Sequence, residues 1–176
     1  MKKEIKIRGS LPVHEQGIQE SLLPCSLRID GLVAKCLDLT AAELEGMPQH
    51  DLRDDFKCRE GWVVPDLSWR GVLLRAVFAL AELHREARHV EASAGDFSIS
   101  LPLDRTAGAL LAISMNGTAL PVAHGGPIRL VVPGGECFTS IKWVDHLELR
   151  AEPGRNTAER IALARLPSSP DTAVIK

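Results

Sequence analysis

Several residue types and patterns are scarce or missing in this sequence, and each absence excludes a class of protein. There is no tyrosine, and aromatic residues make up only 4% of the 176 residues. The core must therefore be built mainly from leucine, valine, isoleucine and alanine. No apolar run approaches the roughly 20 residues that a membrane-spanning helix needs. Residues 1–8 carry charges without an apolar stretch behind them, so we expect no signal peptide and a cytoplasmic location.

A strong charge of one sign is also missing. The formal net charge is −2, and charged residues make up 25% of the chain, as in ordinary globular domains. We therefore expect no nucleic-acid-binding surface and no basic patch for a membrane. The sequence holds neither a Gly-x-Gly-x-x-Gly motif nor a phosphate-binding loop. Together with the lack of regular strand–helix–strand alternation, this excludes a Rossmann domain.

The cysteines show no Cys-x-x-Cys spacing, so we expect no structural zinc site. Three of the four are interpreted as structural residues, since a reduced cysteine usually behaves as a small buried hydrophobe. Cys58 differs, because it ends an expected strand just before a Glu60-Gly61 turn. Its neighbours Lys57 and Arg59 would favour the thiolate, a soft ligand that suits a transition metal. The four are Cys25, Cys36, Cys58 and Cys137.

Turn signals divide the chain into short expected strands and a few helices. Asn116-Gly117 is typical of a tight hairpin turn. Thr40 and Glu43 form a capping-box pattern that opens a short helix. A longer helix is expected directly after Ser68, where apolar residues recur at helical spacing as far as Leu83. The expected strands are residues 26–30, 32–37, 51–58, 89–92, 97–101, 110–115, 118–120, 128–132, 138–143 and 147–149.

This pattern predicts an α+β fold in one domain. We expect residues 1–24 to form a loosely attached N-terminal extension. Residues 25–150 would form the domain itself. Residues 151–176 are interpreted as a C-terminal tail with one short helix over residues 157–166.

Three segments hold polar residues and glycines that packing alone does not explain: residues 56–72, 96–103 and 115–143. In the third, the His124-Gly-Gly-Pro loop can approach a ligand closely, and Arg129 and Lys142 can donate to a phosphate. Each residue also has a plain interpretation. His124 alone is more often a surface-loop or core histidine, and Lys142 a solvated strand charge. Taken together, the segments indicate a cleft with a thiolate on one side and cationic donors on the other.

In this order, the segments resemble the molybdopterin-binding domain of the sulfite oxidase family. The resemblance runs from about Ser26 to Leu149, and the order of its motifs is more specific than any one of them. The segments that carry it are Cys58-x-Glu-Gly-Trp62, Ser98-Ile-Ser-Leu-Pro-Leu103, Met115-Asn-Gly117, His124-Gly-Gly-Pro-Ile-Arg129 and Ser140-Ile-Lys142-Trp143.

The resemblance implies a mixed, multi-stranded α+β fold that holds one molybdenum-molybdopterin cofactor, a pyranopterin dithiolene. Cys58 would be the protein's ligand to the metal, and Arg59 would either guide an anion to the catalytic centre or be a solvent-exposed charge. Trp62 and Trp69 would pack around this loop. The residues that would hold the cofactor are Ser93, His124, Arg129, Ser140, Ile141 and Lys142.

The implied chemistry is two-electron oxygen-atom transfer on a small oxo-acceptor or oxyanion. Because the sequence shows no haem or flavin segment, we expect a separate electron-transfer partner. The chain departs from the family where sulfite oxidases continue after the cysteine with Ala-Gly-Asn-Arg-Arg, since it has Arg59-Glu-Gly-Trp there. Phe97 and Phe138-Thr139 replace the usual Tyr and Tyr-Lys. We therefore expect sulfite to be a poor substrate. A catalytically weak or inactive cofactor-binding or interaction module that retains the fold stays open as the alternative.

Overall fold

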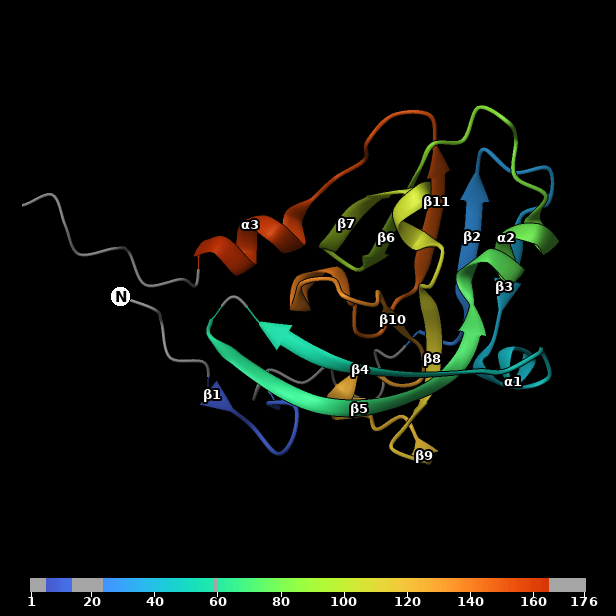
Figure 1. Cartoon of the computed structure of the whole chain (residues 1–176). Coiled ribbons are helices and arrows are strands. Elements are labelled where there is room, and N and C mark those ends of the chain that lie inside the picture. The colour runs from blue at the N-terminus through green and yellow to red at the C-terminus, as the bar shows by residue number, and fades with distance from the viewer. Residues whose placement is uncertain (1–5, 14–23, 59, 165–176) are drawn as a thin grey trace, which may run out of the picture.

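Two β-sheets form the framework of residues 6–13, 24–58 and 60–164, the part of the chain that the computed structural model describes. The long, curved β4–β5 hairpin of the first sheet runs along the bottom of Figure 1, and the second sheet rises above it. In the first sheet, the order is β1 (Lys6–Ile7), β5 (Trp62–Leu73), β8 (Leu110–Met115) and β10 (Arg129–Val131), with β4 (His50–Cys58) paired to β5 and β9 (Thr118–Ala119) paired to β8.

The second sheet joins strands from the two ends of the domain. Its central strand, β11, pairs in parallel with β2 and antiparallel with β6. Its order is β3 (Leu37–Leu39), β2 (Leu27–Gly31), β11 (His146–Arg150), β6 (His89–Ala94) and β7 (Phe97–Pro102). The mixed, multi-stranded α+β class that the sequence predicted is confirmed.

Short helices connect and cover the sheets. The predicted capping box is present at the first of them, because the Thr40 side chain accepts from the Glu43 backbone and the Glu43 carboxylate accepts from the Thr40 backbone. The helices are α1 (Ala41–Glu45), α2 (Leu74–Ala81) and α3 (Thr157–Ala164), with 3-10 turns η2 (Leu103–Thr106), η3 (Val122–His124) and η4 (Cys137–Thr139). Among the described residues, no helix is long and apolar enough to cross a membrane.

Both faces of the first sheet bury apolar side chains, since neighbouring residues of a strand point to opposite faces. Leu111 and Leu130 pack into a core cluster that also contains residues of the second sheet, such as Ile29 and Leu147. Leu110 joins a second cluster with Trp62, Trp69 and Val131. The sheet is thus fixed from both sides, which makes its strand ends rigid positions for functional side chains.

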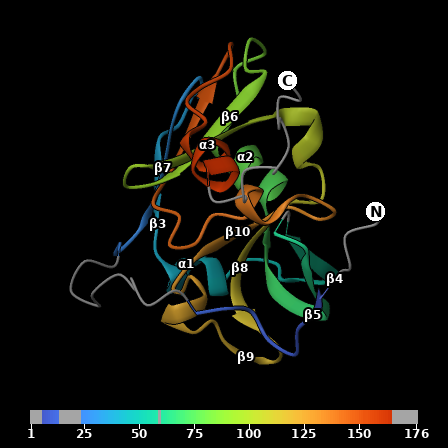
Figure 2. The ribbon, with the colours of Figure 1, turned by 90° about the vertical axis from the view of Figure 1, so that its left-hand side faces the viewer.

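Within the expected N-terminal extension, the described residues 6–13 contact the first sheet. β1 pairs in parallel with β5, and Leu11 is buried in the second cluster. Figure 2 looks onto α3, in the C-terminal tail, which packs on β7 and η4. Its first residue, Thr157, accepts a hydrogen bond from the Ser98 backbone at 2.8 Å.

The helix expected directly after Ser68 begins later. Residues up to Leu73 continue β5, and only Leu74–Ala81 form α2. The reason is pairing with β8, which approaches so closely that a Cβ at Gly71 would lie 2.0 Å from the Leu111 carbonyl oxygen. Helical spacing of apolar residues was misleading here, because part of the stripe belongs to a buried strand.

Two expected strands are also wrong. Of residues 32–37, only Leu37 lies in a strand, and Val33 forms a single isolated bridge with Leu83. Residues 138–143 start in the η4 turn and then follow an irregular path. In that path, Trp143 has a φ of 54°, which is incompatible with an extended strand.

Candidate functional site

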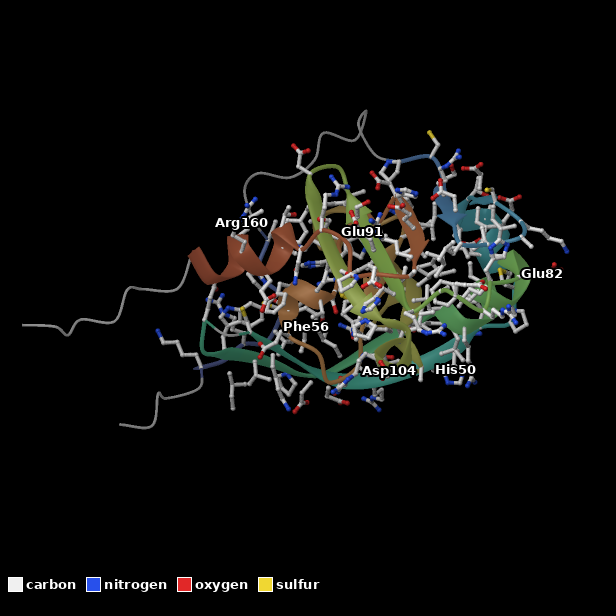
Figure 3. All side chains as sticks on the ribbon, turned by 90° about the horizontal axis from the view of Figure 1, so that it is seen from above. His50, Phe56, Glu82, Glu91, Asp104 and Arg160 are labelled. Atoms are coloured by element: carbon white, nitrogen blue, oxygen red, sulfur yellow. The ribbon has the colours of Figure 1, made fainter. Side chains whose placement is uncertain are left out.

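Cys58 lies at the end of β4, as the sequence predicted, with its side chain half-buried. From Leu52 to Cys58 the even-numbered residues are partly buried while Arg53 and Lys57 are exposed, so these two cations point away from Cys58. Phe56 shares the inner face and lies far along the strand from His50 in Figure 3. His50, at the opposite end of β4, is therefore remote from this position.

Cys137 lies against Cys58, although the sequence predicted only a structural role for it. The Cys137 thiol donates a hydrogen bond to the Cys58 sulfur, and the two sulfurs are 2.8 Å apart. This bond, helped by a backbone hydrogen bond at Glu60, overcomes burial and lowers the pKa of Cys58 to about 7. Cys25 and Cys36 are exposed, whereas the sequence predicted that they would be buried, as reduced cysteines usually are. A thiol pair thus stands where one thiolate was expected.

A hydrogen bond between β4 and the loop that connects β10 to η4 helps to hold Cys137 in this position. The Gly134 backbone N–H donates to the Asp54 carboxylate at 2.7 Å. A Cβ at Gly135 would lie 2.4 Å from the Thr139 hydroxyl and 3.0 Å from the Val132 carbonyl oxygen, so a side chain at this position would force its neighbours to move. The only sequence signal that could have found Cys137 was its place between this diglycine and Ser140-Ile-Lys142.

Arg129 is a buried cation at the start of β10, with only 3% of its surface exposed. Its guanidinium lies over the rings of Phe56 and Trp69, at 5.0 and 5.1 Å from their centroids. One terminal nitrogen donates to the His124 carbonyl oxygen at 2.8 Å. Its Nε has no hydrogen-bond partner among the described residues. Burial lowers the pKa of Arg129 to about 10, which still leaves it charged at neutral pH.

Three side chains fasten the 3-10 turn η3 through successive carbonyl oxygens. Arg129 donates to His124, the Lys142 ammonium donates to Ala123 at 3.0 Å, and the Trp143 indole donates to Val122 at 2.8 Å. Gly125 makes this approach possible, since a Cβ there would lie 2.9 Å from the Lys142 Cα. The loop before β10 and the segment after η4, 19 residues apart in sequence, therefore form one unit.

Burial and like charges set the electrostatics of this unit. Burial, assisted by the charge of Arg129, lowers the pKa of Lys142 to about 8. Burial and the charges of Lys142 and Arg129 also lower the pKa of His124, so its imidazole is neutral at neutral pH. The His124 Nδ1 is buried and has no hydrogen-bond partner within the described part of the chain. This is an environment in which a negative group would be stabilised.

The other predicted cofactor-binding residues lie around the same unit. The Ser140 hydroxyl accepts the Val132 backbone N–H at 3.2 Å, and the Ile141 carbonyl accepts the Leu130 N–H at 2.9 Å. Ser93 is buried in β6, and its carbonyl accepts the Asp145 N–H, three residues after Lys142. Arg59 lies outside the described residues. Trp62 and Trp69 are buried around β4 and β5, as predicted.

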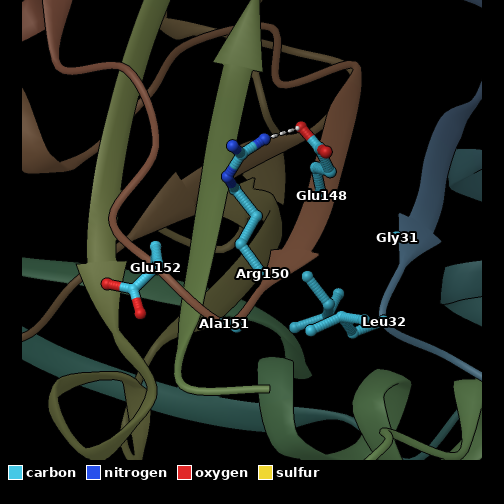
Figure 4. Close-up of a pocket in the computed structure, with 7 residues that line it drawn as sticks. Gly31, Leu32, Glu148, Arg150, Ala151 and Glu152 are labelled. Carbon is cyan, nitrogen blue, oxygen red and sulfur yellow. Dashed lines mark ion pairs between the residues drawn. The ribbon is translucent and has the colours of Figure 1, made fainter. Parts of the chain in front are cut away.

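A separate hollow of about 390 Å³ lies at the far end of the second sheet (Figure 4). It is lined by Gly31, Leu32 and residues 148–152, and Arg150 forms an ion pair with Glu148 at 2.8 Å beside it. None of the predicted site residues lines it. The chemistry of the chain is therefore concentrated around Cys58 and η3.

The residues present fit the cofactor that the sequence resemblance implies. A soft thiol pair is suited to a soft or borderline transition metal. Beside it, the orphaned Arg129 Nε and His124 Nδ1 are buried polar atoms that an outside group could satisfy. The positive charges of Arg129 and Lys142 suit a phosphate. Metal-binding and anion-binding groups thus occur together, as one bound molecule with both functions requires.

Comparison with known proteins gives a consistent result. A model of the oxidoreductase molybdopterin binding domain matches residues 18–158. The chain is 30% identical over 152 residues to the uncharacterized oxidoreductase YuiH of Bacillus subtilis (strain 168), covering 83% of this chain and 77% of YuiH. It is also 30% identical over 151 residues to sulfite oxidase of Gallus gallus, covering 67% of this chain but only 33% of that enzyme.

The fold agrees with a solved member. The sulfane dehydrogenase SoxCD from Paracoccus pantotrophus superposes with a TM-score of 0.71 at 27% sequence identity, covering 80% of this chain and 41% of that one. The residues matched by the family model, 18–158, include every segment that carries the resemblance. This chain therefore belongs to the oxidoreductase molybdopterin-binding domain family, of the sulfite oxidase type, and its cofactor is molybdenum bound to molybdopterin.

Proposed function

We propose that the chain is an enzyme that transfers an oxygen atom, in a two-electron step, to or from a small oxo-acceptor or oxyanion. Cys58 is the protein's ligand to the metal. The observation that carries this proposal is the half-buried Cys58 thiol with a pKa of about 7, placed at a rigid strand end. A sulfur that ionises this readily is available as a thiolate ligand at neutral pH. The bound cofactor supplies the redox chemistry, and the protein positions and shields it.

The unit around η3 holds the anionic part of the cofactor. Arg129 and Lys142 each donate one hydrogen bond to a backbone carbonyl oxygen of η3, and both have further N–H donors for a phosphate. His124 supplies a neutral ring nitrogen. Ser140 and Ile141 fix the backbone of the same segment to β10, and Ser93 supports its far end through Asp145. These residues bind and orient, and none of them needs to move a proton.

The substrate's charge must be met by other residues. Arg129 is enclosed between two aromatic rings and the η3 turn, so it serves the cofactor side of the site. Lys57 and Arg53 lie on the outer face of β4. Arg59 is thus the cation adjacent to Cys58 that remains to guide an anion. Because a dianion is costly to desolvate without paired positive charge, sulfite is a poor substrate and neutral acceptors such as sulfoxides compete well.

Electrons pass between this domain and a separate electron-transfer partner, and the substrate is a small molecule. The test is purification from a host that makes molybdopterin, followed by metal analysis and a substrate screen with artificial electron carriers. We expect about one molybdenum per chain, the stoichiometry of a single thiolate site. The screen compares kcat/KM for sulfite, a sulfoxide, an N-oxide and nitrate, at low and high salt.

Arg59→Gln separates the substrate classes. It is expected to lower kcat/KM for anions and leave the sulfoxide reaction nearly unchanged. A wild type that strongly prefers sulfite, with a steep salt dependence that Arg59→Gln abolishes, would restore a sulfite oxidase. Full molybdenum loading without turnover of any of the four substrates would favour the inactive cofactor-binding module.

A further inference from the structure

We infer that Cys58 and Cys137 form a reversible disulfide in the cofactor-free protein, and that this bond withholds the metal-ligand sulfur until it is reduced. The consequence for metal binding rests on the proposed role of Cys58 as the ligand. The disulfide itself rests only on the placement of the two thiols. It would make this site responsive to the redox state of its surroundings before the cofactor is bound.

The geometry brings together two thiols from distant parts of the chain. Cys58 ends β4 and Cys137 begins η4, 79 residues later, and their sulfurs are 2.8 Å apart. Converting this contact to a disulfide needs the sulfurs to approach by less than about 1 Å. The Gly134–Asp54 hydrogen bond fastens the loop that carries Cys137 to the same strand. The pair is therefore held in place before any oxidation occurs.

Both thiols are half-buried, so small reagents can reach them, whereas the other two cysteines are exposed and lie elsewhere in the fold. Cys25 precedes β2 and Cys36 precedes β3, in the second sheet, and both are exposed. They provide matched controls, because they report oxidation that depends on exposure alone. A bond specific to Cys58 and Cys137 would have to come from their proximity.

The reaction balances with a peroxide as the oxidant. The sulfur of one thiolate attacks a peroxide oxygen, the O–O bond breaks, and a sulfenic acid and one water form. The second thiol then attacks the sulfenic sulfur, the S–S bond forms, and a second water leaves. The dithiol loses two electrons and two protons, and hydrogen peroxide is reduced to two waters. A dithiol reductant reverses the change and is itself oxidised to a disulfide.

Two consequences follow for the site. A sulfur in a disulfide is no longer a thiolate and cannot serve as the metal ligand. The bond also protects Cys58, because a sulfenic acid without a neighbouring thiol can proceed to the irreversible sulfinic acid. Once molybdenum binds Cys58, that sulfur is no longer available to Cys137. The disulfide therefore protects Cys58 in the cofactor-free protein, and it must be reduced before Cys58 can bind the metal.

The experiment uses the full chain in two forms, made in a host without molybdopterin synthesis and in a host with it. Each is treated with stoichiometric hydrogen peroxide, and intact mass and peptide mapping are measured before and after dithiothreitol. The cofactor-free wild type should lose two hydrogen atoms, with residues 58 and 137 cross-linked, and should regain them on reduction. Cys36→Ser should behave in the same way.

Cys137→Ser and Cys137→Ala should lose the cross-link, and with a second equivalent of peroxide they should accumulate sulfinic acid at Cys58. The molybdenum-loaded protein should form no cross-link. Oxidation that joins Cys58 to Cys25 or Cys36, or that leaves Cys137 reduced in the wild type, would overturn the disulfide. A cross-link that forms equally in the loaded protein would overturn its effect on the metal site. The ligand role is judged separately, by the molybdenum content of reduced Cys58→Ser, so the two ideas can fail independently.

Discussion

Two buried charged side chains in this molecule, Glu91 and Arg129, differ in whether other residues pair with their charge. Glu91, in β6, is 4% exposed and is fully paired, because its two carboxylate oxygens accept from the Arg155 guanidinium at 2.7 Å and the Arg155 backbone at 2.8 Å. Arg129 is equally buried, yet it forms no ion pair with any described residue and leaves Nε unbonded.

We interpret this difference as that between a charge with a structural role and a charge available to a bound group. Glu91 belongs to a closed arrangement that attaches the C-terminal tail to the second sheet. Arg129 is open, and burying a charge without a counter-charge costs free energy unless another group supplies it. A bound phosphate is a natural source of that charge.

The strongest test is Cys58→Ser, at the metal end of the open site. A hydroxyl is a hard and poorly ionised ligand, so we expect loss of activity and of the thiolate-to-molybdenum absorption band, with the fold retained. Cys25→Ser and Cys36→Ser should keep both signals. The absorption spectrum and the activity of each purified variant test whether Cys58 is the metal ligand. A Cys58→Ser protein that kept the band and full turnover would contradict the ligand role.

Arg129→Met should weaken cofactor retention about tenfold to a hundredfold, since a charge-assisted hydrogen bond contributes roughly 1.5–3 kcal/mol. Turnover per bound molybdenum should change much less. In the cofactor-free protein, thermal stability should change little, because loss of the hydrogen bond to His124 is offset by removal of a desolvated charge. Metal analysis, activity and thermal melting are measured together. Normal loading with collapsed turnover per metal would move Arg129 to the substrate side.

Glu91→Gln should do the reverse, destabilising the fold without affecting cofactor loading. We expect the free energy of unfolding to fall by about 1.5–3 kcal/mol, the scale of hydrogen bonds to a charged group. Burial raises the pKa of Glu91, but the hydrogen bonds from Arg155 outweigh it and hold the pKa below its usual value.

A carboxylate whose pKa is lowered by folding stabilises the protein at pH values above its unfolded pKa. That contribution is lost as the pH falls through the lower folded pKa. Denaturant titrations between neutral and acidic pH should therefore show the wild type approaching the Glu91→Gln variant as the pH falls. A constant difference between the two proteins down to the acid limit would argue against this pairing.

The smallest effect concerns Lys142. Because burial and the charge of Arg129 lower its pKa to about 8, this residue loses its charge as the pH rises above that value in the cofactor-free protein. Phosphate binding should weaken by several-fold as the pH rises through this value, which is roughly the contribution of one charge pair near the protein surface. Lys142→Met should bind less tightly at neutral pH and show no such pH dependence. Equilibrium dialysis with the apo-protein checks this.

The sequence proposed a candidate site but did not name every residue that the structure brings together there. Cys58, Arg129 and Lys142 were singled out because each lies in a motif with recognisable neighbours. Cys137 was not singled out, because its contact with Cys58 joins residues 79 positions apart, and its only local signal is its place between a diglycine and Ser140-Ile-Lys142. The hydrogen bonds that Arg129 and Lys142 donate to η3 were not predicted either, because they too are tertiary contacts.

Local pattern also failed where tertiary pairing prevailed. The apolar stripe after Ser68 fits a helix, but residues up to Leu73 are required by β8 as a strand partner. Residues 138–143 were expected to form a strand, but their polar groups pair with β10 and the η3 loop instead. By contrast, the Thr40 capping box was predictable, because all of its partners lie within four residues.

The position of β11 has a consequence for how the chain folds. This strand lies between β2 and β6, so residues 27–31 obtain their central partner only after residues 146–150 have been synthesised. Until then the edges of β2 and β6 present unpaired backbone groups, which favour association with other chains. Contacts of such long sequence separation also slow folding. A ribosome-bound chain that stops before residue 146 should therefore depend on chaperones, and release of the complete β11 should end that dependence.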